Sequence, residues 1–148
     1  MKTNILKIAT LLLIFATLLS GCKKEEFIEF TEFQLFEFGC NWKNTKQDEV
    51  IIINSTTELE KYTDCTYGEY PEIDFSKHTL LLASGCTSSG IHCISAKELQ
   101  QLSAKKYKLN VEITLNDAAA VEKWTIALIT NKLSNTSKIK LNTTIIRP

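Results

Sequence analysis

The clearest pattern along the chain is the strict alternation of polar and apolar residues between Lys108 and Leu115. Successive side chains of a β-strand point to opposite faces, so a strand with one buried and one solvated face reads in this way. Leu109, Val111 and Ile113 share the apolar face with Leu115. The segment therefore predicts a half-buried strand of an antiparallel sheet.

Several other segments have the composition of strands. Residues 50–53 and 79–83 are almost continuously apolar, which is typical of strands buried within a sheet. Residues 124–130 carry apolar side chains on both faces and predict a central strand. Weaker patterns predict further strands over residues 32–38 (a first strand or an aromatic edge), 91–94 and 138–146.

Helical signals are few and short. Ser55 and Glu58 match a capping box, in which the serine accepts a hydrogen bond from the helix and the glutamate reaches back to the preceding backbone. This pattern predicts a short helix over residues 56–64. Residues 118–122 predict one further helical turn, and residues 96–104 fit a helical turn and a loop equally well.

The expected fold class is α+β, with a twisted antiparallel sheet of about six strands and one short packed helix. The same spacing of short strands allows the sheet to curl into a partly closed barrel. Residues 39–148 are expected to form a single globular domain, because a chain of this length can bury one core. We expect the protein to be a monomer.

The beginning of the chain has the pattern of an export signal. Basic residues precede an apolar run over residues 8–19, which is too short to span a membrane comfortably. The run ends in Leu-Ser-Gly-Cys, which resembles a bacterial lipobox, where the cysteine receives fatty acyl chains such as palmitate. The resemblance implies a signal peptide over residues 1–21, a lipid anchor at Cys22 and a tether over residues 22–38.

The residues after Cys22 indicate which membrane would hold the anchor. Lys23 stands where an aspartate would signal retention in the inner membrane. The sequence Lys-Lys-Glu-Glu over residues 23–26 resembles the surface-export signal of some Gram-negative phyla, although a solvated tether has the same composition. The expected location is the outer membrane, facing either the periplasm or the cell surface.

Charge and motifs exclude several classes of function. The whole chain carries 17 basic and 17 acidic residues, and loss of the leader with its two lysines leaves a net charge of about −2. The sequence shows no basic stripe, so a nucleic-acid partner is not expected. It also has no phosphate-binding loop, dinucleotide fingerprint or His-Glu-x-x-His motif, so no cofactor is expected.

Four cysteines follow the predicted anchor: Cys40, Cys65, Cys86 and Cys93. An even number of cysteines in an exported chain predicts two disulfides, for which three connectivities exist. We favour Cys40–Cys65 with Cys86–Cys93, because the second pair spans a short turn. A metal site that includes His92 is an alternative, but adjacent ligands lack the usual spacing, and free thiols are a third possibility.

Catalytic candidates are sparse. Asp74, Ser76 and His78 invite comparison with a hydrolytic triad, but a turn that starts a strand explains the same residues more simply. A thiol nucleophile would need a free cysteine near a base such as His92. We therefore expect no enzymatic activity, with a small envelope hydrolase or a thiol-redox enzyme as the alternative.

Aromatic residues cluster around the first two of these cysteines. Aromatic side chains often anchor protein interfaces, although they also cover the edges of sheets. The turn between the strands that start at residues 79 and 91 offers a second exposed segment. The candidate partner surface consists of Trp42, Tyr67, Tyr70, Ser88 and Ser89.

The order of these elements carries a family resemblance. An apolar strand and a capped helix lead to Pro-Glu-Ile-Asp-Phe-Ser over residues 71–76, which precedes the strand at residues 79–83. Over residues 49–146 this order resembles the C-terminal-like domain of the protease complex subunit PrcB. The family often has Thr-Gly-Gly-Tyr in the following turn, whereas residues 86–91 read Cys-Thr-Ser-Ser-Gly-Ile.

The resemblance implies a small domain that binds a partner without catalysis. Together with the lipobox, it predicts a lipid-anchored module of the cell envelope that binds another protein, for example a protease. An accessory of outer-membrane assembly is a further alternative.

Overall fold

The computed structural model describes residues 26–66 and 68–147. The predicted signal peptide at residues 1–21, the predicted lipid anchor at Cys22 and the candidate surface residue Tyr67 lie outside the described residues.

The described residues form ten strands, one 3-10 helix and one short α-helix. In chain order these elements are β1 (Glu26–Ile28), β2 (Phe30–Glu32), η1 (Phe36–Phe38), β3 (Cys40–Trp42), β4 (Glu49–Ile53), α2 (Thr56–Leu59), β5 (Thr63–Cys65), β6 (His78–Thr87), β7 (Ile91–Ser103), β8 (Lys106–Leu115), β9 (Glu122–Asn131) and β10 (Lys138–Ile146).

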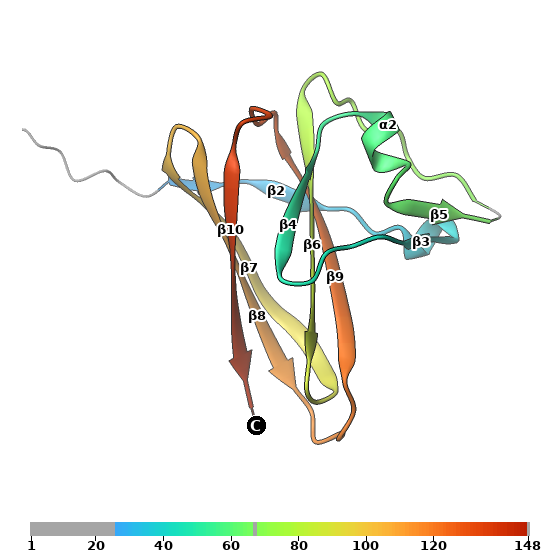
Figure 1. The fold of residues 1–148 in the computed structure, drawn as a ribbon, viewed down its shortest axis with the longest axis vertical. Coiled ribbons are helices and arrows are strands. Elements are labelled where there is room, and N and C mark those ends of the chain that lie inside the picture. Colours follow the sequence, from blue (N-terminus) through green and yellow to red (C-terminus); the bar gives the residue numbers. More distant parts are fainter. Residues whose placement is uncertain (1–25, 67, 148) are drawn as a thin grey trace, which may run out of the picture.

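The long strands form two four-stranded sheets that pack face to face (Figure 1). Sheet A has the order β1-β7-β8-β10, and sheet B has the order β2-β9-β6-β4. A third sheet of β3 and β5 lies beside sheet B. In Figure 1 the β7–β8 turn marks the upper end of this sandwich and the β6–β7 turn marks its lower end.

The structure changes the expected fold class from α+β to a mostly-β sandwich. The predicted short helix exists, but it has four residues and forms no layer of its own. Each large sheet ends in two edge strands, so the described sheets are open and give no support to a barrel. Neighbouring strands are antiparallel except β8 and β10, which run parallel, and this exception departs from the expected antiparallel sheet.

The inner faces of the two sheets enclose the main core. Leu109, Val111 and Ile113 of β8 are at most 1% exposed, which confirms the strand predicted from strict alternation. They meet inward-facing residues of sheet B such as Leu81 and Leu128. Burying one such side chain contributes roughly 1.5–3 kcal/mol, so this core is the main source of stability.

Sheet B also buries the upper half of its outer face. Leu80 and Leu82 of β6 pack there against a layer that contains Leu35, Leu59 and Ile73. This covering layer includes η1, β3, α2 and β5 (Figure 1). A strand between two apolar layers needs apolar residues at consecutive positions, which explains the continuous run in β6.

The helix begins as its capping pattern predicts. The Ser55 hydroxyl accepts a hydrogen bond from the Glu58 N–H at 3.2 Å, and the Glu58 carboxylate accepts one from the Asn54 N–H at 2.7 Å. The helix ends at Leu59 rather than at residue 64, because the chain turns there into β5. The Leu59 carbonyl accepts the Tyr62 N–H at 2.9 Å and the Thr63 hydroxyl at 3.2 Å, so the end of the helix is hydrogen-bonded to the chain that follows it.

Three segments differ from their predicted structures. Residues 26–38, expected in the tether, contribute β1, β2 and η1 to the folded domain. The ambiguous residues 96–104 belong largely to the long strand β7, and residues 118–122 form no helical turn. β1 and β2 pair with strands far along the chain, and such pairings leave little local pattern.

Candidate functional site

The first predicted disulfide is present and fastens the covering layer. Cys40 of β3 and Cys65 of β5 are directly opposite in their antiparallel pair and are joined by a disulfide. The bond closes a loop with a sequence separation of 25. In the chain-entropy model a loop of this length contributes about 3–4 kcal/mol. The disulfide therefore joins β3 covalently to β5 within the covering layer.

The second predicted disulfide is wrong: Cys86 and Cys93 are free and exposed. Along β6, Ala83 and Gly85 occupy positions that face the inter-sheet core, so Cys86, the next residue, lies on the outer face of sheet B. Cys93 pairs with the outward Thr114 and lies on the outer face of sheet A. Packed sheets are about 10 Å apart, whereas bridged cysteines need Cα atoms within about 7 Å, so the sandwich separates this pair.

One concave site is a groove of about 460 Å³ on the side of the sandwich. Thr125, Ile126 and Ala127 of β9 form one wall, and Ile94 and Lys97 of β7 form another. The remaining wall comes from the chain between β2 and β3, at Glu32, Phe33, Gln34, Leu35, Phe36, Cys40, Asn41 and Trp42. The groove is therefore open between the two sheets and bounded by the covering layer.

An ion pair fixes one wall of the groove. Lys97 Nζ of sheet A lies 2.6 Å from Glu32 Oε1 of sheet B. The Lys97 side chain is 15% exposed, so water screens this pair less than it screens a pair on the open surface. Because each charge has its partner inside the groove, neither is left free to bind an ion.

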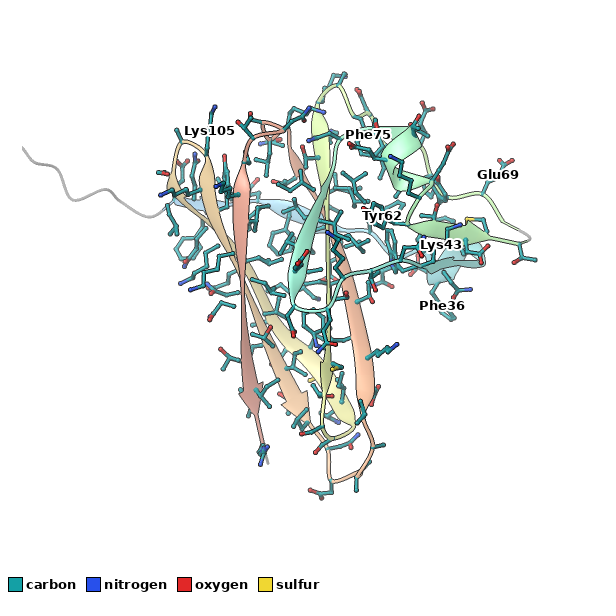
Figure 2. All side chains as sticks on the ribbon, viewed as in Figure 1. Phe36, Lys43, Tyr62, Glu69, Phe75 and Lys105 are labelled. Atoms are coloured by element: carbon teal, nitrogen blue, oxygen red, sulfur yellow. A yellow bond between two sulfur atoms is a disulfide. The ribbon has the colours of Figure 1, made fainter. Side chains whose placement is uncertain are left out.

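Aromatic side chains form the other wall. The Phe33 ring packs edge-to-face with Trp42 at 6.2 Å between centroids and with Tyr70 at 6.3 Å. Phe36 is 85% exposed beside this cluster, and Figure 2 shows it at the margin of the β3–β5 layer. An aromatic side chain held in water beside a groove is typical of a residue that anchors a partner.

The backbone of β9 is also available along the groove. β2 pairs with residues 128–130 of β9, and the Phe33 N–H donates to the Ala127 carbonyl at 2.9 Å. Beyond Ala127 the described part of β9 has only β6 as a neighbour. The backbone N–H and C=O groups of successive strand residues point to alternate sides of the strand. Those of Ala127 point toward β2, so the N–H and C=O groups of Thr125 and Lys123 point to the same side, where β9 has no neighbour among the described residues.

The predicted partner surface divides into two places. Trp42 and Tyr70 both contact Phe33 at the upper, covered side of the sandwich. Ser88 and Ser89 lie in the turn between β6 and β7 at the lower end (Figure 1). Phe36 belongs to the aromatic cluster that the sequence offers as a partner surface, but its 85% exposure leaves no sequence signal that would single it out. The Lys97–Glu32 pair joins residues 65 positions apart, and such a contact leaves no local sequence signal either.

The possible hydrolytic triad forms a turn instead. The Asp74 carboxylate accepts hydrogen bonds from the Ser76 backbone and hydroxyl and pairs with Lys77 at 2.9 Å. The Ser76 hydrogen bonds, followed by the Lys77 contact, hold the pKa of Asp74 well below its usual range. His78 enters this turn through its backbone N–H, which donates to the Asp74 carbonyl at 2.9 Å.

The described residues contain no group of three side chains that could together hold a metal ion, and His92 is exposed. Within the same residues, no helix has the length and apolar character needed to cross a membrane. Comparison of the chain with protein-family models, curated proteins and solved structures finds no match. The resemblance to the PrcB C-terminal-like domain therefore stays a prediction.

Proposed function

We propose that the protein is a lipid-anchored binding module of the bacterial outer membrane that holds another envelope protein without catalysing a reaction. The observation that carries the proposal is the groove beside β9, where an exposed Phe36, a rigid aromatic cluster and an unpaired strand edge meet. The lipobox-like sequence before Cys22 supports the anchorage. A protease is the partner class that the PrcB-like order of elements suggests.

The composition of the groove supports binding rather than chemistry. Its two charged side chains, Lys97 and Glu32, neutralise each other, and its other side chains are mainly apolar. The free edge of β9 can accept an extended segment as an added strand, with main-chain hydrogen bonds giving affinity. Ile126 and Ile94 would then receive the inward-pointing side chains of that segment.

The enzymatic alternatives receive no such support from the described side chains. The Asp74 carboxylate is committed to Ser76 and Lys77. Cys86 and Cys93 point away from each other on opposite outer faces, so they offer no paired thiols for disulfide exchange within one chain.

The proposal is tested by capturing partners on the full chain, extracted in detergent from the cell that makes it. We expect one stoichiometric envelope protein, and we expect Phe36→Ser to weaken its capture about tenfold or more, as for an interface anchor. Val121→Ser is the matched control, because Val121 is 76% exposed but lies in the β8–β9 turn, away from the groove. Equal capture by both variants would remove the groove from the proposal.

A second pair of variants tests the strand edge. Thr125→Pro removes an outward N–H without removing a bond to β6, whereas Thr125→Val keeps that N–H. Weaker capture by the proline variant alone would show that the partner adds a strand to β9. Unchanged melting temperatures would show that both variants are folded.

A further inference from the structure

We propose that the upper end of sheet A is a second membrane contact, which lies on anionic lipid headgroups beside the predicted lipid anchor. It extends the proposed anchorage at Cys22 and is independent of the partner groove. Its centre is a group of five lysines, called the basic face: Lys105, Lys106, Lys108, Lys138 and Lys140.

The fold assembles this face from two separate parts of the sequence. β8 and β10 run parallel, with Lys106 directly opposite Lys138 and Lys108 directly opposite Lys140. All four alternate with inward residues such as Tyr107 and Ile139, so they lie on the outer face. Lys105 adjoins them, because the Lys138 N–H donates to the Lys105 carbonyl at 2.9 Å.

The arrangement is unfavourable for the isolated protein. Like charges directly opposite on neighbouring strands repel each other and destabilise the sheet. Among the described residues, ion pairs involve Lys46, Lys77 and Lys97, and no carboxylate pairs with the basic face. An external anionic surface would supply the missing counter-charge.

Exposed apolar side chains lie near the lysines, one of them on the same face. Phe27 of β1 is 64% exposed and lies opposite Gln100 of β7, which in turn lies opposite Lys108. Leu102, near the β7–β8 turn, is 37% exposed. Exposed aromatic and aliphatic groups beside lysines are typical of surfaces that insert shallowly into the headgroup region of a membrane. This combination favours a lipid surface over a soluble anion.

The position in the chain supports the same occupant. β1 begins at Glu26, so only residues 23–25 separate it from Cys22. Such a segment spans at most about 14 Å when fully extended. Glu26 pairs with Gln101, in the upper part of sheet A, so an acylated Cys22 would hold the basic face close to the headgroups. Anchors of this kind are strengthened when a lipid chain is combined with a basic patch.

Acidic residues limit the contact to the upper end. Glu98 lies opposite Asn110, and Glu112 lies further down β8. Anionic headgroups repel these two carboxylates, so the lower part of sheet A is held off the surface. The domain would therefore stand on its upper end rather than lie flat on sheet A.

The test uses the full lipidated chain reconstituted into vesicles of phosphatidylcholine, with and without phosphatidylglycerol. Mass spectrometry measures the rate at which each lysine is acetylated by a water-soluble reagent. We expect phosphatidylglycerol to slow acetylation of the basic face about fivefold, with recovery at high salt. Lys61 and Lys123 lie outside this face, and their rates should be equal on the two vesicles.

Charge-reversal variants provide the matched control. Lys106→Glu with Lys138→Glu should abolish the protection of the remaining three lysines, whereas Lys61→Glu with Lys123→Glu makes the same change in net charge and should preserve it. Equal acetylation of the basic face on both vesicle types would overturn the proposal. Equal protection by inorganic phosphate or by a DNA duplex on phosphatidylcholine vesicles would also overturn it, because the occupant would not be the membrane.

The experiment distinguishes failure of the proposed lipid anchor from failure of the proposed contact through the basic face. If Cys22 is not acylated, the chain will stay off phosphatidylcholine vesicles, and the proposed lipid anchorage falls. If the chain is anchored but its lysines react uniformly, the anchorage stands and the basic face is excluded as a contact.

Discussion

The outer faces of the two sheets differ although both sheets share one core. On the central strand of sheet B, outward Leu80 and Leu82 are buried under the covering layer. On the central strand of sheet A, the outward positions are occupied by polar residues such as Lys108, Asn110 and Glu112. One outer face of the sandwich thus forms a second apolar core, whereas the other carries polar and charged side chains.

This difference shows that the spacing of apolar side chains along a strand indicates whether one or both of its faces are covered. A strand covered on one face alternates, as β8 does, while a strand covered on both faces loses its alternation, as β6 does. Within β6 the change occurs along its length, because Ser84 and Cys86 follow Leu80 and Leu82 on the outer face. The point where apolar outward residues give way to polar ones marks the end of the covering layer.

The largest expected effect comes from placing a carboxylate on each face in turn. Leu82→Asp buries an unpaired charge between two apolar layers and should destabilise the protein by more than about 4 kcal/mol. Asn110→Asp places the same group on the outer face of sheet A and should change stability by less than about 0.5 kcal/mol. Urea unfolding measures both, and similar losses would contradict the assignment of a covered and an uncovered face.

The two cysteine pairs sharpen the comparison further. Replacing Cys40 and Cys65 by Ala removes the bond that fastens the covering layer and should cost about 3–4 kcal/mol. The Cys86→Ala and Cys93→Ala double variant removes two exposed free thiols and should remain within about 0.5 kcal/mol of the parent. Thermal unfolding with and without reductant checks both: reductant should lower the melting temperature of the second variant, which keeps the Cys40–Cys65 bond, and leave that of the first unchanged, and the reverse would contradict the pairing.

The ion pair across the groove is expected to have a smaller effect. Lys97→Met removes the partner of Glu32 and should cost about 1 kcal/mol, because the Lys97 side chain is only 15% exposed and the pair joins the two sheets. Lys77→Met removes a pair with Asp74 whose side chains are 74% and 46% exposed, and it should cost less. Chemical denaturation of the two variants ranks the pairs, and a reversed ranking would contradict the burial argument.

The smallest effect has the opposite sign. Lys138→Thr relieves the repulsion with Lys106 and should stabilise the protein by roughly 0.2–0.5 kcal/mol at low salt. The gain should vanish at high salt, since screening weakens the repulsion in the parent. Lys123→Thr serves as the control on a strand without an opposite lysine, and an equal gain there would show that net charge rather than pairing is responsible.

Part of this fold could be predicted from local sequence. Alternation in β8, the apolar run in β6 and the capping box before α2 each depend on neighbours within a few residues, and all three elements are present. The parallel pairing of β10 and the sheet-edge positions of β1 and β2 depend on contacts between distant segments. No period within those short segments reveals which strand they will join.

The same distinction applies to the sites. Trp42 and Tyr70 were expected on a common surface, and both pack against Phe33. The basic face escaped the sequence analysis because its lysines come from two segments that are brought together only by the β8–β10 register. Absence of a basic stripe in the sequence therefore did not exclude a basic surface in the folded protein.

The length of β7 sets a height for the groove. Ser103 ends this strand at the upper end of the sandwich, and Lys97 lies six positions earlier at the groove wall. At about 3.3 Å per residue, the groove would open roughly 20 Å above a bilayer that meets the upper end. If the proposed membrane contact holds, a partner of the groove would have to present its binding segment at this height above the bilayer.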